Sequence, residues 1–182
     1  MIKYTFIDDS VVNLGGTSLT LNAIIEPFKE ECELISTADL NKIHLQFKHP
    51  RVWIIGNTLN LNKESYETLI TILQRKRTVK IDFDYGYCKY RGPTPHKILG
   101  KKECDCLENP ETLSLKNIYT LIHNNSSAVF YMSEGQRQIH KKYFPVSEEK
   151  SLVLSSCFTS ESFDKMRQMR EVEKNGKYAI IQ

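Results

Sequence analysis

Short apolar runs alternate along the chain with longer segments whose apolar residues recur at helical spacing, and this rhythm decides the class of fold. Runs typical of strands occupy residues 3–7, 32–36, 51–56, 78–85, 128–132 and 152–155. Helix-like segments occupy residues 17–31, 63–77, 112–123, 134–144 and 160–173. Repeated strand–helix units predict a parallel sheet with helices on both faces, so we expect a single Rossmann-like α/β domain.

The charge, the hydropathy and the cysteine count exclude several other classes of protein. The 182 residues hold 25 Lys and Arg against 22 Asp and Glu, and a net charge of +3 is too small for a typical nucleic-acid-binding surface. No apolar run approaches a membrane span of about 20 residues, and the N-terminus lacks the layout of a signal peptide. Five cysteines, an odd number, favour thiols or a metal site over a disulfide framework. We therefore expect a cytoplasmic domain without a nucleic-acid partner.

Polar residues stand where several predicted strands end, and parallel sheets bind ligands at this edge. They are Asp9 after the first strand, Asp84 and Tyr85 at the end of the fourth, and Glu134 after the fifth. Asp82 and Asp84 lie on one face if their strand is regular. A carboxylate at this edge can act as a general base, which makes Asp84 the candidate catalytic residue. A role in ordering the following loop explains Asp84 equally well.

Gly15, Gly16 and Thr17 lie between the first strand and the first helix. Glycines there let a ligand approach the backbone, and the free N–H groups at a helix start attract anions such as phosphate. The complete glycine fingerprint of dinucleotide-binding proteins and the P-loop lysine are both missing. A turn that merely needs positive φ angles is therefore an equal alternative to a binding role.

Residues 86–110 interrupt the rhythm and are expected to form a long loop rich in Gly and Pro. They contain Cys88, His96, Cys104 and Cys106 in a C-x7-H-x7-C-x-C spacing. Three thiolates and one imidazole suit a tetrahedral structural zinc ion, which would stabilise a loop of low apolar content. A disulfide between two of the thiols, or three unrelated cysteines, are the alternatives. Arg91, in the same loop, could contact a sugar or a phosphate, and a solvated loop is the commoner explanation.

Several motifs, taken in order, carry a resemblance to a known family. They are Phe6-Ile7-Asp8-Asp9 with Leu14-Gly15-Gly16-Thr17, Ile81-Asp82-Phe83-Asp84-Tyr85, Tyr131-Met132-Ser133-Glu134-Gly135-Gln136-Arg137, Phe144-Pro145, Val153-Leu154-Ser155-Ser156-Cys157-Phe158 and Phe163-Asp164. Their order and spacing resemble the N-terminal half of a GT-B glycosyltransferase, in the large retaining group that uses nucleotide sugars. The Cys/His segment departs from the general pattern of that family.

The resemblance implies an acceptor-binding domain over residues 1–177, with residues 178–182 as the start of a missing C-terminal donor-binding domain. The whole enzyme would transfer a sugar from a nucleotide diphosphate sugar to a glycan or lipid-linked acceptor, with peripheral membrane contact as an option. The chain alone would then lack turnover, because both reactants must be held together. The implied acceptor- and donor-binding residues are Asp9, Gly15, Gly16, Thr17, Tyr85, Arg91 and Glu134, with Asp84 as the catalytic residue.

Two further classes of function stay open. Asp8 and Asp9 could bind magnesium in a receiver-like or nucleotide-binding regulatory domain. The third predicted strand ends in Gly56-Asn57, where a receiver needs an aspartate, and this argues against that class. A zinc-stabilised interaction module, with residues 86–106 as its binding surface, is the third option.

Overall fold

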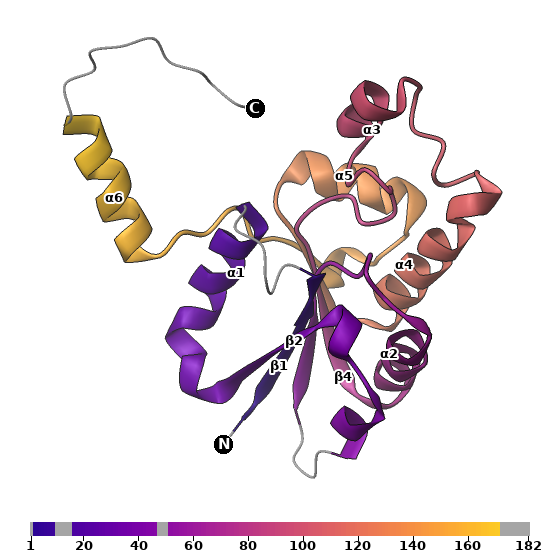
Figure 1. Ribbon diagram of the computed structural model, residues 1–182, viewed down its shortest axis with the longest axis horizontal. Coiled ribbons are helices and arrows are strands. Elements are labelled where there is room, and N and C mark those ends of the chain that lie inside the picture. The colour runs from indigo at the N-terminus through magenta and orange to yellow at the C-terminus, as the bar shows by residue number, and fades with distance from the viewer. Residues whose placement is uncertain (1, 10–15, 47–50, 172–182) are drawn as a thin grey trace.

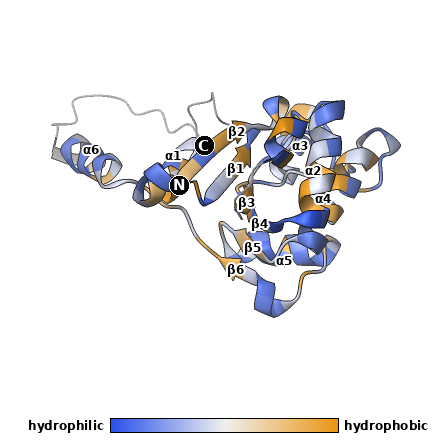
Figure 2. Ribbon diagram, turned by 90° about the horizontal axis from the view of Figure 1, so that it is seen from below, coloured by the Kyte–Doolittle hydropathy of each residue, from blue (hydrophilic) through white to orange (hydrophobic). Residues whose placement is uncertain are grey.

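Six parallel strands form a single sheet in the order β2-β1-β3-β4-β5-β6 (Figures 1 and 2). The computed structural model describes residues 2–9, 16–46 and 51–171. The strands are β1 (Tyr4–Asp8), β2 (Cys32–Ser36), β3 (Val52–Ile55), β4 (Arg77–Asp82), β5 (Ala128–Tyr131) and β6 (Ser151–Val153). The expected α/β class with an all-parallel sheet is confirmed.

Among the described residues, five α-helices and several short 3-10 turns lie between the strands, and a sixth α-helix follows the last strand. The helices are α1 (Gly16–Ile25), α2 (Lys63–Arg75), α3 (Pro93–Gly100), α4 (Leu113–Asn125), α5 (Glu134–Tyr143) and α6 (Ser160–Glu171). The 3-10 turns are Glu26–Glu31, Thr37–Asp39, Lys42–Gln46, Pro110–Thr112 and Glu148–Lys150. Among the described residues, no helix combines the length and the apolar composition needed to cross a bilayer.

The connections run in opposite directions on the two sides of β1, and this places helices on both faces of the sheet. The chain passes from β1 to β2 in one direction and from β3 through β6 in the other. Right-handed crossovers then put α1 on one face and α2, α4 and α5 on the other, as Figures 1 and 2 show. The helix α6 follows β6 and stands beyond α1, apart from the sheet, in both views.

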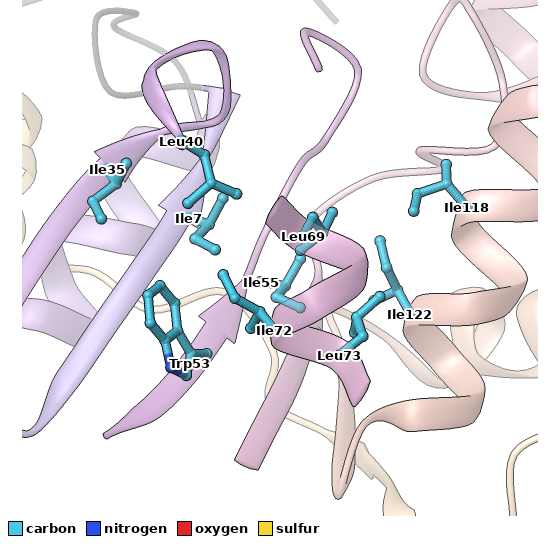
Figure 3. Packing of buried hydrophobic residues seen from close by; sticks show 10 residues of the cluster. All are labelled: Ile7, Ile35, Leu40, Trp53, Ile55, Leu69, Ile72, Leu73, Ile118 and Ile122. Atoms are coloured by element: carbon cyan, nitrogen blue, oxygen red, sulfur yellow. The ribbon is translucent and has the colours of Figure 1, made fainter. Parts of the chain in front are cut away.

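The main core fills the space between the sheet and the helices α2 and α4 (Figure 3). Its buried members are Ile7, Ile35, Leu40, Trp53, Ile55, Leu69, Ile72, Leu73, Ile118 and Ile122. Leu69, Ile72 and Leu73 are three and four residues apart, so one stripe of α2 faces the sheet. Burial of such side chains stabilises the fold by about 1.5–3 kcal/mol each.

Two element ends differ from the sequence prediction because of local backbone chemistry. The helix expected over residues 17–31 ends at Ile25 and continues as a 3-10 turn containing Pro27. Proline lacks the N–H that a continuing helix needs. The strand expected over residues 78–85 ends at Asp82, so Asp84 lies two residues beyond the end of the strand.

The segment 86–110 is not the irregular loop that its glycines and prolines predict. It contains the helix α3, which begins at Pro93. Proline is well tolerated at the first position of a helix, where its missing N–H has no helical partner to lose. Gly15 and residues 178–182, both part of the sequence predictions, lie outside the described residues.

Candidate functional site

The carboxyl ends of β1 and β3 meet where the direction of the connections reverses, which is where parallel α/β sheets bind ligands. Asp8 Oδ2 accepts the N–H of Asn57 at 2.7 Å. A Cβ on Gly56 would lie 2.0 Å from that carboxylate oxygen, so only glycine allows the two chain segments to approach this closely. Asp8 thus joins the ends of the two strands.

Asp9, predicted as a binding residue, is buried and orders the loop that follows β3. Its carboxylate accepts the N–H of Leu59 at 2.6 Å and that of Asn60 at 3.3 Å, and the hydroxyl of Thr37 also donates to it. These contacts engage both carboxylate oxygens. Arg91 Nη2 lies 3.5 Å from Asp9 Oδ2 and connects this carboxylate to the neighbouring cleft.

A cavity of about 530 Å³ lies at the carboxyl edge of the sheet, beyond β4 and β5. It is lined by Phe83, Asp84, Tyr85, Arg91, Gly92, Pro93, Thr94, Pro95, Met132, Ser133, Gln136 and Ile139. Three of the predicted site residues, Asp84, Tyr85 and Arg91, therefore share one cleft. We call this cavity the ligand cleft.

Asp84 is the central carboxylate of the ligand cleft. Its Oδ2 accepts hydrogen bonds from Arg91 Nη1 and Asn57 Nδ2, each at 3.2 Å. Its Oδ1 is buried and has no hydrogen-bond partner among the described residues. Burial raises the pKa of Asp84, and the nearby positive charges of Arg91 and Lys80 oppose that rise in part.

Arg91 reaches Asp84 and Asp9 from an unusual backbone conformation. Its φ is 60°, in the left-handed region that costs non-glycine residues about 1–2 kcal/mol. Such strain persists only where surrounding contacts hold it, and it concentrates at functional sites. Gln136 helps to hold the cleft: its side chain accepts the N–H of Met132 at 2.7 Å and donates to the carbonyl of Asp84 at 3.0 Å.

The remaining predicted ligand contacts are not in the ligand cleft. Gly16 and Thr17 line a second cavity of about 370 Å³, which borders the first because both include Phe83 and Met132. Glu134 is exposed at the start of α5 and forms an ion pair with Arg137 at 2.9 Å. Ser133, expected to cap this helix, does so by accepting the N–H of Gln136 at 3.1 Å.

The four residues of the predicted metal site come together in space, and we call them the Cys/His cluster. Cys88 Sγ lies 3.6 Å from Cys104 Sγ and 3.9 Å from Cys106 Sγ. His96 Nδ1 lies 3.4 Å from the sulfurs of Cys88 and Cys106. A tetrahedral ion with metal–sulfur bonds of about 2.3 Å has sulfurs about 3.8 Å apart. These four residues could therefore hold one metal ion without rearrangement.

The environment of the Cys/His cluster suits a closed metal site. Cys88, His96 and Cys106 are buried, and Cys104 is partly so. Burial raises the pKa of the Cys88 and Cys104 thiols, that of Cys104 to about 12, so a metal must displace their protons on binding. The far nitrogen of His96 lies 3.7 Å from Asp105 Oδ1, a carboxylate that can orient the ring of a metal-bound histidine.

A second group of buried metal-type donors, which we call the Asp82 cluster, lies beneath α4 and α5. Asp82 Oδ2 receives His123 Nε2 at 2.8 Å and His140 Nδ1 at 3.0 Å. The other carboxylate oxygen accepts the hydroxyl of Tyr119 and lies 3.2 Å from Lys80 Nζ. Asp82, Lys80 and both histidines are at most 1% exposed.

The hydrogen bonds of the Asp82 cluster hold the ring of His123 between two oxygen atoms. His123 Nδ1 faces the carbonyl of Tyr119 at 2.8 Å and its Nε2 faces the Asp82 carboxylate at 2.8 Å. Burial opposes the ionisation of Asp82, but the positive charges of Lys80 and His123 outweigh it and hold its pKa well below the ordinary value.

The sequence analysis missed most of the Asp82 cluster. Its members come from β4, α4 and α5, and His123 and His140 stand 41 and 58 residues from Asp82. The local pattern pointed the other way: Lys80 and Asp82 alternate with Val79 and Ile81, and such alternation is typical of a strand with one polar, solvent-facing side. Local sequence therefore carried no signal that these two charges are buried.

Comparisons of this chain with protein-family models, with curated proteins and with solved structures found no match.

Proposed function

We propose that the chain is the acceptor-binding half of a glycosyltransferase that moves a sugar from a nucleotide diphosphate sugar to a glycan or lipid-linked acceptor. The observation that carries the proposal is the ligand cleft, in which Asp84, Tyr85 and Arg91 meet at the carboxyl edge of the sheet. The type of reaction, transfer of a sugar, is inferred from the resemblance of the sequence motifs to GT-B glycosyltransferases. A donor-binding domain, absent from this chain, would complete the enzyme, and the chain alone would lack turnover.

The chemistry of the ligand cleft suits a neutral, hydroxyl-rich ligand. Asp84 Oδ1 is a buried hydrogen-bond acceptor without a partner among the described residues. A hydroxyl group of the bound sugar would donate a hydrogen bond to it. The positive charge of Arg91 is already shared between Asp84 and Asp9, so it offers little excess charge to a phosphate. Phe83 and Tyr85 supply apolar surface against which a sugar ring can pack.

Each residue then has a defined role in the proposed enzyme. Asp84 would accept a hydrogen bond from the attacking hydroxyl and take up its proton, Arg91 would hold Asp84 in place, and Tyr85 would orient the ring. Gly16 and Thr17, in the bordering cavity, would approach the donor sugar or its phosphate. Asp9, through its contact with Arg91, would support the same cleft.

We further propose that the metal of the Cys/His cluster is zinc and that its role is structural. Three thiolates and one imidazole are a donor set typical of structural zinc, and four protein ligands leave no position open for a substrate. The ion would tie α3, through His96, to the turn that holds Cys88 and to the loop that holds Cys104 and Cys106.

A receiver-like regulatory domain is the second candidate, because the order β2-β1-β3-β4-β5 is also the order of receiver domains. Asn57 stands where the phosphorylated aspartate of a receiver follows the third strand, and Asp9 is engaged by backbone amides. Incubation with acetyl phosphate separates the candidates. A phosphoryl adduct on an aspartate, seen by mass spectrometry, would favour the receiver over the glycosyltransferase.

The direct test is binding of the zinc-loaded chain to an array of neutral mono- and oligosaccharides. We expect saturable binding to at least one of them, weakened at least about tenfold by Asp84→Asn, which removes a charged hydrogen-bond acceptor. The matched control is Asp164→Asn on α6, which changes an exposed carboxylate and should bind as the wild type does. Absence of binding to every neutral sugar, with the chain folded and metal-loaded, would contradict the proposal.

A further inference from the structure

The wall of the ligand cleft and the ligands of the Cys/His cluster occupy the same short stretch of chain. Five consecutive residues, Arg91 to Pro95, line the cleft. Cys88 precedes them by three residues and His96 follows them directly. This wall, residues 91–95, is therefore flanked on both sides by a residue of the Cys/His cluster: Cys88 before it and His96 after it.

Backbone hydrogen bonds connect Cys88 directly to Arg91, so the position of Cys88 determines where Arg91 lies. The N–H of Cys88 donates to the carbonyl of Tyr85 at 2.8 Å, and the N–H of Arg91 donates to the carbonyl of Cys88 at 2.8 Å. Cys88 Sγ also lies 3.5 Å from the carbonyl oxygen of Gly92. Cys88 is thus the centre of the turn that places Arg91 in its left-handed conformation.

His96 holds the other end of the wall through α3. Its N–H donates to the carbonyl of Gly92 at 3.0 Å, the first backbone hydrogen bond of that helix, while its ring is buried against the thiols. Pro93 and Pro95, in the same helical turn, face the ligand cleft. The first turn of α3 therefore contributes residues both to the ligand cleft and to the Cys/His cluster.

The wall lacks a regular strand, and the turn before it is packed by aromatic rings: Tyr85, Tyr87 and Tyr90 belong to one apolar cluster with Cys88 and Cys106. Residues 83–92 form bends and turns without a regular element, and fixing each such residue costs about 1–2 kcal/mol of backbone entropy. Ile98 and Leu99, the large apolar residues of α3, are 69% and 66% exposed, so α3 is not held by an apolar face. That apolar cluster includes the thiols of Cys88 and Cys106, so a metal bound by them would link it to His96 and α3.

We propose that the metal bound by the Cys/His cluster positions the ligand cleft, with Cys88 and His96 as positioning residues for Arg91 and for the Arg91–Asp84 pair. The nature of the ligand rests on the function proposed above. The positioning of the wall stands on the backbone contacts and can be tested without any ligand.

The test is hydrogen–deuterium exchange of the full chain, zinc-loaded and after removal of zinc by a chelator. We expect amides of residues 84–95 to exchange at least about tenfold faster without zinc, because their order depends on the metal. The amides of α2, which pack in the main core, should be unchanged and serve as the internal control. If residues 84–95 exchange at the same rate in both states, or if α2 loses protection to the same extent, the specific positioning role is overturned.

Two variants of His96 distinguish loss of zinc from the Cys/His cluster from other effects of the chelator on the protein. His96→Ala should reproduce the fast exchange of residues 84–95, whereas His96→Cys should restore slow exchange in zinc, because four thiolates also form a structural zinc site. Cys157→Ser, which changes a thiol outside the cluster, is the matched control and should behave as the wild type. Failure of His96→Cys to slow exchange while it binds zinc would contradict the proposal.

Sugar binding, measured on the same samples, separates this proposal from the proposed function. Binding that is equal with and without zinc would overturn the positioning role and leave the function standing. Zinc-dependent exchange in a chain that binds no neutral sugar would overturn the function and leave the positioning role standing. Binding that is lost together with zinc, with α2 still protected, supports both.

Discussion

The Cys/His cluster and the Asp82 cluster both gather buried metal-type donors within 4.8 Å of one another, yet their chemistry differs. The donor atoms of the Cys/His cluster mainly contact one another. The Asp82 carboxylate instead receives hydrogen bonds from His123, His140 and Tyr119 and lies beside Lys80.

The difference shows that proximity of donors is not enough to make a metal site. A dication entering the Asp82 cluster would meet the amino group of Lys80, and it would have to break hydrogen bonds that already satisfy the carboxylate. The Cys/His cluster has protons on its thiols to give up and few other bonds to lose. We therefore expect the first cluster to bind metal and the second to be a structural ion network.

The largest expected effect concerns metal content. The purified wild-type chain should hold one zinc ion, and Cys106→Ser should hold none, because a tetrahedral site loses one of its four ligands. Asp82→Asn should retain one zinc ion. Elemental analysis by mass spectrometry measures both, and two ions in the wild type, or zinc loss in Asp82→Asn with Cys106→Ser unaffected, would reverse the assignment of the clusters.

Removal of the central charge should cost the most stability. Asp82→Asn leaves Lys80 and His123 buried without their counter-charge, and removal of one partner from a buried ion pair costs about 3–5 kcal/mol. Urea unfolding of the zinc-loaded proteins at neutral pH measures the difference. A loss below about 1 kcal/mol would mean that Asp82 is not the charged centre of this cluster.

The pH dependence of that difference identifies the charge itself. The pKa of Asp82 in the folded chain lies below its ordinary value of 3.8, so on acidification the unfolded chain binds the proton first. The stability that Asp82 contributes is present above about pH 4 and is lost as the pH falls through the folded pKa. The gap between wild type and Asp82→Asn should therefore close in acid, where both proteins lose zinc alike. A gap that stays constant down to the acid unfolding of both would contradict an ionised Asp82.

The smallest expected effect concerns one hydrogen bond. Tyr119→Phe removes the hydroxyl that donates to Asp82 and keeps the ring in place, which should cost about 1.5–3 kcal/mol for a bond to a charged group. Zinc content should not change. Thermal unfolding with elemental analysis checks both, and a change in zinc content would show that the two clusters are coupled.

Much of the fold follows from features that neighbouring residues encode. The strand–helix rhythm predicts the α/β sheet, Ser133 predicts the start of α5, and the sequence placed Asp84 at the carboxyl edge of the sheet, where it lies two residues beyond β4. The close spacing of Cys88, His96, Cys104 and Cys106 predicted a cluster that the structure assembles. Each of these sequence patterns involves residues that are close together along the chain.

The long-range groupings came only from the tertiary structure. Asp9 proved to order a loop, and Glu134 proved to lie outside the ligand cleft. The Asp82 cluster joins β4 to two helices far along the chain. The sequence by itself determined the elements and the local metal-type motif, because periodicity, caps and short spacings are properties of adjacent residues. The order of the strands and the packing of the helices decided which side chains from distant parts of the chain share a site. The number of residues between two such side chains does not determine how far apart they lie in the folded protein.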